Sequence, residues 1–405
     1  MFVGWDWASE SHDVTVLDDS GGIVTRFSLR HNEEGIMSAI HRLRALGGPE
    51  EVPVAIESTC GLVVDRLLEA GLVVHCVHPN SFNAARPRWG TSRAKSDPGD
   101  SYKLADYLRT DGHRLRRLAP MDRATANLRA LSRQRDDLVA AKVSATNQLA
   151  ALLDHHWPGA KAVFFRLDSE IALAFLEDYP TPRSAERLGV SRMAQFCRRH
   201  SYCGRRSPEK LLERLREAPE SVGALDDDVL GACVRQAVAG LRASLTSIDQ
   251  LEGLMGAELM GHPAAALFGA MPRVGEVNLA QLIAEVYPIL ARAQSATHAA
   301  AEVGASPVTR ASGHGRSVNF RWATNARARQ ALSTYADNSR HASPWAAHLY
   351  REARLRGKRH PHAIRIVMRS WTRVMWACLQ SGVAYDPARH GQEIHFRGLD
   401  TGVAA

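Results

Sequence analysis

The sequence predicts a mixed α/β domain followed by a mostly helical remainder. Short apolar strands alternate with helices up to residue 112, a pattern that favours a mixed sheet with helices on its faces. Long helical patterns follow, and the last third of the chain is helical and basic. We therefore expect an α/β domain at 1–115, long helices at 116–262, a C-terminal domain at 263–383 and a tail at 384–405.

The α/β domain opens with three strand patterns, FVGWDWA, DVTVLDD and IVTRFSLR. The last two alternate apolar and polar residues and are joined by the turn signal Asp-Ser-Gly-Gly at 19–22. The patterns that follow are the helix EEGIMSAIHRLRAL, the strand VPVAIEST, the helix GLVVDRLLEAG, the strand LVVHCVHP and the helix DSYKLADYLRTD.

Two long helices are predicted at 120–157 and 226–262. In the second helix, apolar residues recur every seven positions, at Val234, Leu241, Ile248 and Met255. This spacing predicts an antiparallel coiled coil, with two helices of an ordinary bundle as the alternative. An Arg-rich insert at 158–225 separates them. The C-terminal domain then begins with a turn and helix, MPRVGEVNLAQLIAEV, similar to a helix-hairpin-helix.

Charge indicates a polyanionic partner. The net charge is +8, yet the segment 305–380 alone holds 14 Arg and Lys against two acids. The N-terminus has neither the basic nor the apolar region of a signal peptide, and no stretch has the length of apolar residues that a membrane span needs. We therefore expect a cytoplasmic protein.

Four acids are candidates for chemistry: Asp6 in the first strand, Glu57 after a later strand, and Asp97 and Asp100 at the start of a helix. Strand ends and helix N-termini meet at one edge of an α/β sheet, so the four can converge there. Clustered carboxylates repel one another unless a cation neutralises them, and all-oxygen ligands suit Mg²⁺ or Mn²⁺. The alternative is ordinary helix capping and a turn.

These acids resemble the DEDD tetrad of a RuvC-like domain with an RNase H-like sheet. The segments VGWDWAS, VAIEST and RAKSDPGDSYKLA are more narrowly similar to the Piv/IS110 family of DEDD insertion-sequence transposases and DNA invertases. The last family motif reads close to Lys-Thr-Asp-x-x-Asp-Ala, and here Ser96 and Ser101 replace Thr and Ala. Independently of the resemblance, two such metal ions would clamp the attacking and leaving oxygens of a phosphoryl transfer, and Arg93 and Lys95 would hold a nearby phosphate.

The C-terminal domain resembles the same family independently, in MPRVGEVNLAQLIAEV, GASPVTRASGHGRS and RWATNARARQAL. Arg273 replaces the first glycine of the family's Pro-Gly-(Val/Ile)-Gly hairpin. The resemblance makes Ser312 the nucleophile that attacks a DNA phosphate, with Ser306 and Ser317 as rivals. Arg310 and Arg316 flank this serine and would stabilise the phosphorane. Further nucleic-acid contacts are expected from Arg321, Arg327 and Arg329.

The resemblance implies a transposase that cuts and rejoins DNA through a phosphoserine link. It also implies a structured guide RNA encoded by the element. A composite active site and paired DNA ends favour a homodimer or tetramer. Three alternatives stay open at this point. They are a RuvC-like Holliday junction nuclease that uses water, an actin-like sugar kinase suggested by the opening Asp-hairpin pattern, and a DNA-binding protein without catalysis.

Overall fold

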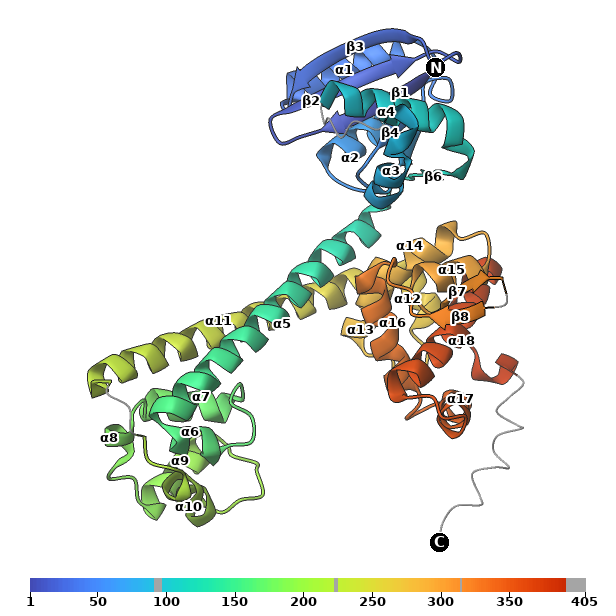
Figure 1. The fold of residues 1–405 in the computed structure, drawn as a ribbon. Helices are drawn as coiled ribbons and strands as arrows, with labels where there is room; N and C mark the ends of the chain where they lie inside the picture. The colour runs from blue at the N-terminus through green and yellow to red at the C-terminus, as the bar shows by residue number, and fades with distance from the viewer. Residues whose placement is uncertain (91–96, 222–224, 314, 391–405) are drawn as a thin grey trace. The chain divides into compact units, whose positions relative to one another are not determined.

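The structure is a computed structural model that describes residues 1–90, 97–221, 225–313 and 315–390. The chain divides into two compact units, Met1–Asp122 and Arg123–Ala405. Figure 1 labels the helices and strands of both units. Among the described residues, no helix combines the length and the apolarity that crossing a membrane requires.

The first unit is built on a six-stranded mixed sheet with the order β3-β2-β1-β4-β5-β6. The strands are β1 (Phe2–Trp7), β2 (Ser11–Leu17), β3 (Ile23–Arg30), β4 (Val54–Ile56), β5 (Val74–Cys76) and β6 (Arg116–Arg117). Strand β1 pairs antiparallel with β2 and parallel with β4, and β4 pairs parallel with β5. The predicted mixed sheet is confirmed, while β6 was not predicted.

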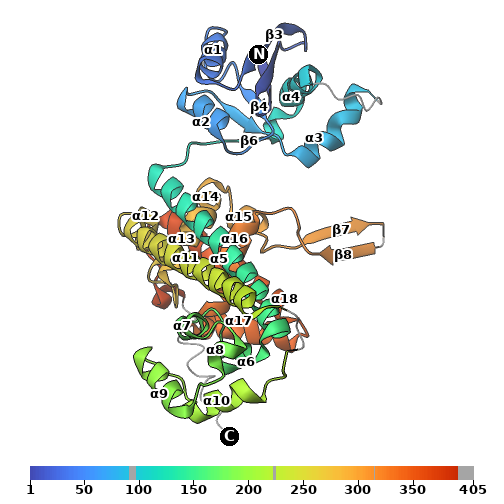
Figure 2. The ribbon, with the colours of Figure 1, turned by 90° about the vertical axis from the view of Figure 1, so that its left-hand side faces the viewer.

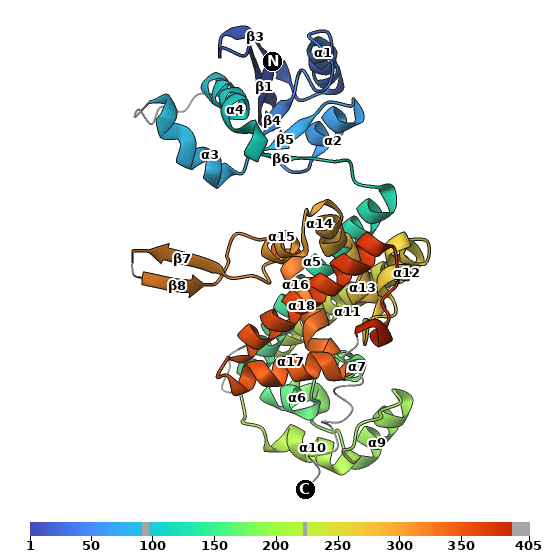
Figure 3. The same ribbon diagram turned by 90° about the vertical axis from the view of Figure 1, so that its right-hand side faces the viewer.

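Helices cover both faces of this sheet, as Figures 2 and 3 show. They are α1 (Glu33–Arg44), α2 (Leu62–Glu69), α3 (Pro79–Ala85), α4 (Asp97–Asp111) and the 3-10 turns η1 (Arg86–Trp89) and η2 (Gly112–Arg114). Val3 and Trp5 point into the core beneath α1 and α2. Ala55 packs on the other face, with α3 and α4. Side chains alternate along a strand, so neighbouring residues of β1 and β4 face α4.

The second unit opens with two long helices, α5 (Arg123–His156) and α11 (Asp227–Met260), which lie side by side in Figure 1. They run antiparallel, because Asn127 near the start of α5 donates a hydrogen bond to Glu258 near the end of α11. The four residues of the predicted heptad row are all buried. Glu252 of α11 accepts a hydrogen bond from Arg135 of α5. The coiled coil itself stays a prediction.

The Arg-rich insert is helical and packs between the ends of these two helices. Its helices are α6 (Pro158–Val163), α7 (Glu170–Asp178), α8 (Pro182–Ala185), α9 (Val190–Arg199) and α10 (Pro208–Glu217). Apolar residues of α6, α7, α9 and α10 form one core with the end of α5 and the start of α11. The arginines of the insert therefore lie on a helical subdomain whose core includes residues of α5 and α11.

The C-terminal part is a helical domain with one hairpin. Its elements are α12 (Pro263–Phe268), α13 (Glu276–Gln281), the π-helical turn η3 (Leu282–Val286), α14 (Tyr287–Arg292), α15 (Ala296–Glu302), β7 (Val308–Ser312), β8 (Gly315–Asn319), α16 (Ala326–Ser339), α17 (Pro344–Leu355), α18 (His360–Ser381) and η4 (Pro387–His390). Trp371 of α18 is fully buried and contacts Tyr335 and Trp345 edge-on. The hairpin β7–β8 extends away from these helices (Figures 2 and 3).

Candidate functional site

Strand register brings Asp6 and Glu57 to one edge of the sheet. In the parallel pair of β1 and β4, Trp5 lies opposite Ile56, and the next residues along the two strands are Asp6 and Glu57. Asp6 is the second-to-last residue of β1, in the first strand as predicted. Both acids are half-buried. They share the sheet face of Gly4 and Ala55, which is the face that α4 covers.

Helix α4 places Asp100 against this face. Gly4 permits the close packing, because a Cβ atom at this position would lie 2.0 Å from the carbonyl oxygen of Ser101. The Ser101 hydroxyl also forms a buried hydrogen bond of 2.8 Å with Thr15 on β2. Asp100 itself is 3% exposed. Ser101 therefore anchors the helix to the sheet next to Asp100, one of the four predicted acids.

Two cations neutralise Asp100. Arg86 donates a hydrogen bond of 2.8 Å to each carboxylate oxygen, and Lys103 donates one of 2.9 Å. Burial pushes the pKa of Asp100 upward, but the hydrogen bonds and charges of Arg86 and Lys103 outweigh it, so this pKa lies below its usual value. Asp100 is therefore ionised at neutral pH.

Arg86 links the three described acids of the tetrad electrostatically. Its hydrogen bonds to Asp100 raise the pKa of Arg86, burial opposes the rise, and the negative charges of Asp100, Glu57 and Asp6 add to it. The guanidinium also lies over the ring of Phe82, 4.8 Å from its centroid. Sequence reasoning missed Arg86, since it belongs to the short turn η1, for which the pattern gave no signal.

The remaining N-terminal candidates lie outside the described residues, entirely or in their side chains. Arg93 and Lys95 are in the undescribed segment 91–96, and Asp97 is described only as the first residue of α4. Among the side chains that the structure describes, no three Asp, Glu, His or Cys residues are close enough to hold a metal ion. The donor set is carboxylate oxygen, which suits Mg²⁺ or Mn²⁺. The four-acid metal site stays a prediction.

Ser312 lies at the tip of the hairpin in the second unit. It ends β7 opposite Gly315, the first residue of β8, and its side chain is exposed. Gly313 follows with φ of +53°, a left-handed conformation that a side chain would strain. Arg310, two positions before Ser312, lies on the same face of the strand. His314 and the side chain of Arg316 lie outside the described residues.

The other predicted nucleic-acid contacts already have partners within the chain. Arg321 donates to the backbone carbonyls of Ser306 and Pro307, and so fastens the root of the hairpin. Arg327 pairs with Asp137 of α5 at 2.8 Å. Arg329 donates to the carbonyl of Arg321. These three arginines hold the fold around the hairpin, and their contact with nucleic acid stays a prediction.

Sequence reasoning missed a buried acid, Glu285, which lies between α5 and the start of α16. Glu285, in the π-helical turn η3, is 2% exposed and accepts hydrogen bonds from Arg133 and Asn325. Burial acts to raise the pKa of Glu285. The hydrogen bonds from Arg133 and Asn325 and the charges of Arg133 and Arg129 outweigh burial, so this pKa lies below its usual value. The signal was visible as a single acid inside the apolar run LIAEVY. This network joins α5 to the start of α16.

The mixed sheet with Asp6, Glu57 and Asp100 on its α4 side fits the RuvC-like DEDD class of nucleic-acid enzymes. Two transposase family models match the chain. One, for DEDD transposases of the IS110 type, covers residues 3–158, and the other, described as the transposase IS116/IS110/IS902 family, covers residues 265–351. The chain belongs to this IS110 family of transposases, and is therefore an enzyme that acts on DNA in transposition.

Individual proteins similar to this chain also come from insertion elements or are named putative transposases. The mini-circle putative transposase for IS117 of Streptomyces coelicolor is 29% identical over 399 residues, which are 96% of each chain. The uncharacterized 43.6 kDa protein of insertion element IS110, from the same organism, is 27% identical over 95% of each chain. The putative transposase y4uE of Sinorhizobium fredii is 34% identical over 202 residues, 49% of this chain and 56% of its own. The sugar-kinase alternative is left without support.

Proposed function

We propose that this transposase cuts and rejoins DNA through a covalent link between Ser312 and a DNA phosphate. The observation that carries the proposal is the convergence of Asp6, Glu57 and Asp100 on one side of the sheet, in a chain whose family match also covers Ser312. In the cutting step the Ser312 oxygen bonds to phosphorus and the bond from phosphorus to one ester oxygen breaks. The departing strand end keeps that oxygen and takes up the proton that Ser312 loses.

Asp6, Glu57, Asp97 and Asp100 are the proposed ligands of Mg²⁺ or Mn²⁺, the divalent metal chemistry expected of a DEDD transposase. Bound metal ions supply charge stabilisation at the phosphate. Arg86 donates a hydrogen bond to each oxygen of Asp100, and would thereby orient this carboxylate toward a cation. Arg310, which lies on the same strand face as Ser312, is the proposed ligand of the phosphate that this serine attacks.

We further propose that a structured RNA from the element guides target choice and that the active enzyme is a dimer or tetramer. The support is the family membership together with the basic character of the segment 305–380. A protein that holds a nucleic-acid duplex by its shape and phosphates needs such a surface. Reconstitution with and without the RNA transcribed from the element's non-coding end tests the guide. Light scattering on the DNA complex measures the number of subunits.

The central experiment incubates labelled DNA bearing the element's ends with the purified enzyme and separates the products on a denaturing gel. The wild-type protein forms a protein–DNA adduct in Mg²⁺ or Mn²⁺, which a chelator abolishes. Ser312→Ala forms none, whereas the matched control Ser317→Ala on the facing strand keeps it. Cleavage by Ser312→Ala without an adduct would instead establish the water-dependent nuclease.

A further inference from the structure

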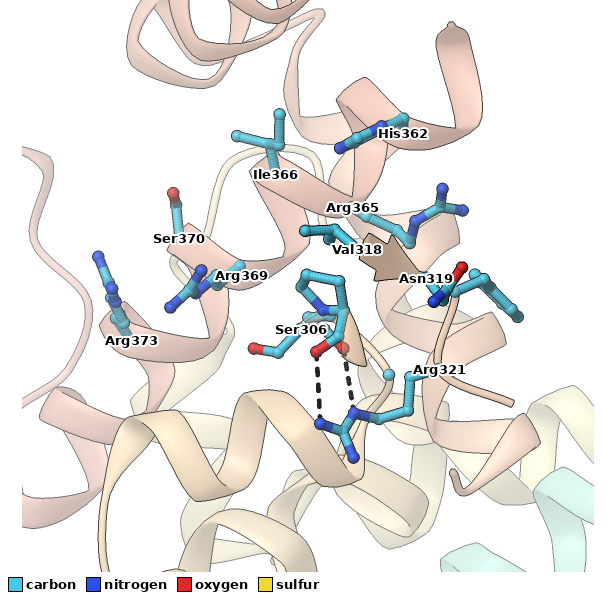
Figure 4. Close-up of a pocket in the computed structure, with 14 residues that line it drawn as sticks. Ser306, Val318, Asn319, Arg321, His362, Arg365, Ile366, Arg369, Ser370 and Arg373 are labelled. Carbon is cyan, nitrogen blue, oxygen red and sulfur yellow. Dashed lines mark hydrogen bonds between the residues drawn. The ribbon is translucent and has the colours of Figure 1, made fainter. Parts of the chain in front are cut away.

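Helix α18 carries a row of basic residues along one face. His362, Arg365, Arg369 and Arg373 follow at intervals of three and four residues, which is the spacing of one side of a helix. The opposite side is buried in the domain core. Figure 4 shows these four side chains spread along one side of the helix. The helix therefore presents a row of cations at the surface.

This row forms one wall of a pocket of about 400 Å³. The other wall is the root of the β7–β8 hairpin, including Ser306, Val318 and Arg321 (Figure 4). No described residue that lines the pocket is acidic, and within the described chain Arg369 and Arg373 form no ion pair. The buried hydroxyl of Ser306 has no hydrogen-bond partner in the part of the chain that the structure describes. Cations without counter-ions and a free hydroxyl are suited to an anion.

Aromatic residues hold the pocket in shape. The guanidinium groups of Arg329 and Arg365 each lie 5.0 Å from the centroid of the Phe320 ring. Burial lowers the pKa of Arg365, and the charge of Arg329 lowers it further. An anion would relieve that repulsion. Trp322 packs edge-on against Phe320 and is 80% exposed, which leaves an indole face beside the pocket on which a base can stack.

We propose that this pocket binds consecutive phosphates of the DNA strand that Ser312 attacks. The proposal rests on the function proposed above. Arg365, Arg369 and Arg373 are four residues apart, about 6 Å along the helix axis, which is comparable with the separation of phosphates along an extended strand. Val318 of the pocket pairs with Thr309, and Ser312 is three positions beyond Thr309, about 10 Å along the strand. The bound phosphates therefore lie a few nucleotides from the scissile one.

The test measures binding of a short single-stranded DNA oligonucleotide to the full-length protein over a range of salt concentrations. Each phosphate contact contributes about 0.7 to the slope of log affinity against log salt for a single strand. The triple variant Arg365→Gln, Arg369→Gln, Arg373→Gln is expected to lower this slope by about two. Arg356→Gln, a surface arginine paired with Glu352, removes a charge outside the pocket and leaves the slope unchanged. An unchanged slope in the triple variant overturns the proposal.

Two further measurements distinguish phosphate binding from misfolding and DNA binding from RNA binding. The variant with lysine at all three positions keeps the charges, and it restores the slope if the pocket binds phosphates and the glutamine variant has not simply misfolded. An RNA oligonucleotide of the same sequence is measured in parallel, and a loss confined to RNA refutes the assignment to DNA. Ser312→Ala keeps the salt slope but forms no adduct. An adduct formed by Ser312→Ala contradicts the proposed nucleophile and leaves the pocket result standing.

Discussion

Arg86 and Asp100 form a two-pronged ion pair in which both guanidinium–carboxylate distances are 2.8 Å. The carboxylate is 4% exposed and the arginine 28%. Arg86 thus acts as a counter-ion within the acid cluster of the first unit. The charge of Arg86 also interacts favourably with Glu57 and Asp6, and so offsets the repulsion among these three carboxylates.

Replacing Asp100 by Asn leaves Arg86 and Lys103 partly buried without their counter-charge. Breaking a buried pair in this way costs about 3 kcal/mol of unfolding free energy, and adduct formation is lost as well. Urea unfolding at neutral pH measures the first effect. The surface variant Asp111→Asn, which removes an ion pair with the half-exposed Arg88, is the control and is expected to cost less than about 1 kcal/mol.

The same pair predicts a pH dependence of stability. Because the pKa of Asp100 is lower in the folded protein than its ordinary value of 3.8, the unfolded chain takes up the proton first as the pH falls. The stabilisation is complete above that value and decreases as the pH falls below it. The stability difference between wild type and Asp100→Asn, measured by urea unfolding, is expected to shrink in that acid range. A difference that stays constant or grows would contradict the assignment.

Gly4→Ala tests how α4 is positioned. The added methyl group meets the Ser101 carbonyl and the Ala105 amide nitrogen at 2.0 and 2.4 Å, so the helix must move away from β1. We expect a loss of about 2 kcal/mol in unfolding free energy and a sharp loss of adduct formation. Gly240→Ala on α11 meets nothing within 4 Å and is expected to stabilise by about 0.5–1 kcal/mol. Equal effects of the two changes would refute the packing argument.

Glu285→Gln tests the network behind the hairpin. The change removes the counter-charge of Arg133 at a site that is 2% exposed, and the expected cost is about 3 kcal/mol. Glu352→Gln breaks only the exposed pair with Arg356, at a cost below about 0.5 kcal/mol. Thermal unfolding of both variants provides the comparison, and similar melting temperatures would show that Glu285 does not stabilise the domain.

Arg273→Gly tests a strained backbone position. Arg273 has φ of +57°, the left-handed conformation that glycine adopts without steric cost. We expect Arg273→Gly to stabilise the protein by about 1 kcal/mol. Arg273→Ala removes the side chain but keeps the Cβ atom, so it is expected to give no such gain. If Arg273→Ala stabilised the protein and Arg273→Gly did not, the arginine side chain rather than the backbone conformation would be the cause.

The sequence by itself determined the regular elements and the family. Alternating strands and helical periodicity predicted β1 to β5 and the helices α1, α2, α4, α5 and α11, and the buried heptad row of α11 was visible as spacing. The acids of the tetrad were found through motifs around Asp6, Glu57 and Asp100. The hairpin that carries Ser312 was not predicted as strands, because Gly, Ser and Arg give little strand signal.

Only the tertiary structure decided which residues meet. Arg86 reaches Asp100 because the turn η1 returns beside α4, and the pocket forms because α18 packs next to the hairpin root. Periodicity fixes which face of a helix or strand a residue occupies. It does not specify what packs against that face, since this depends on how segments distant in sequence come together.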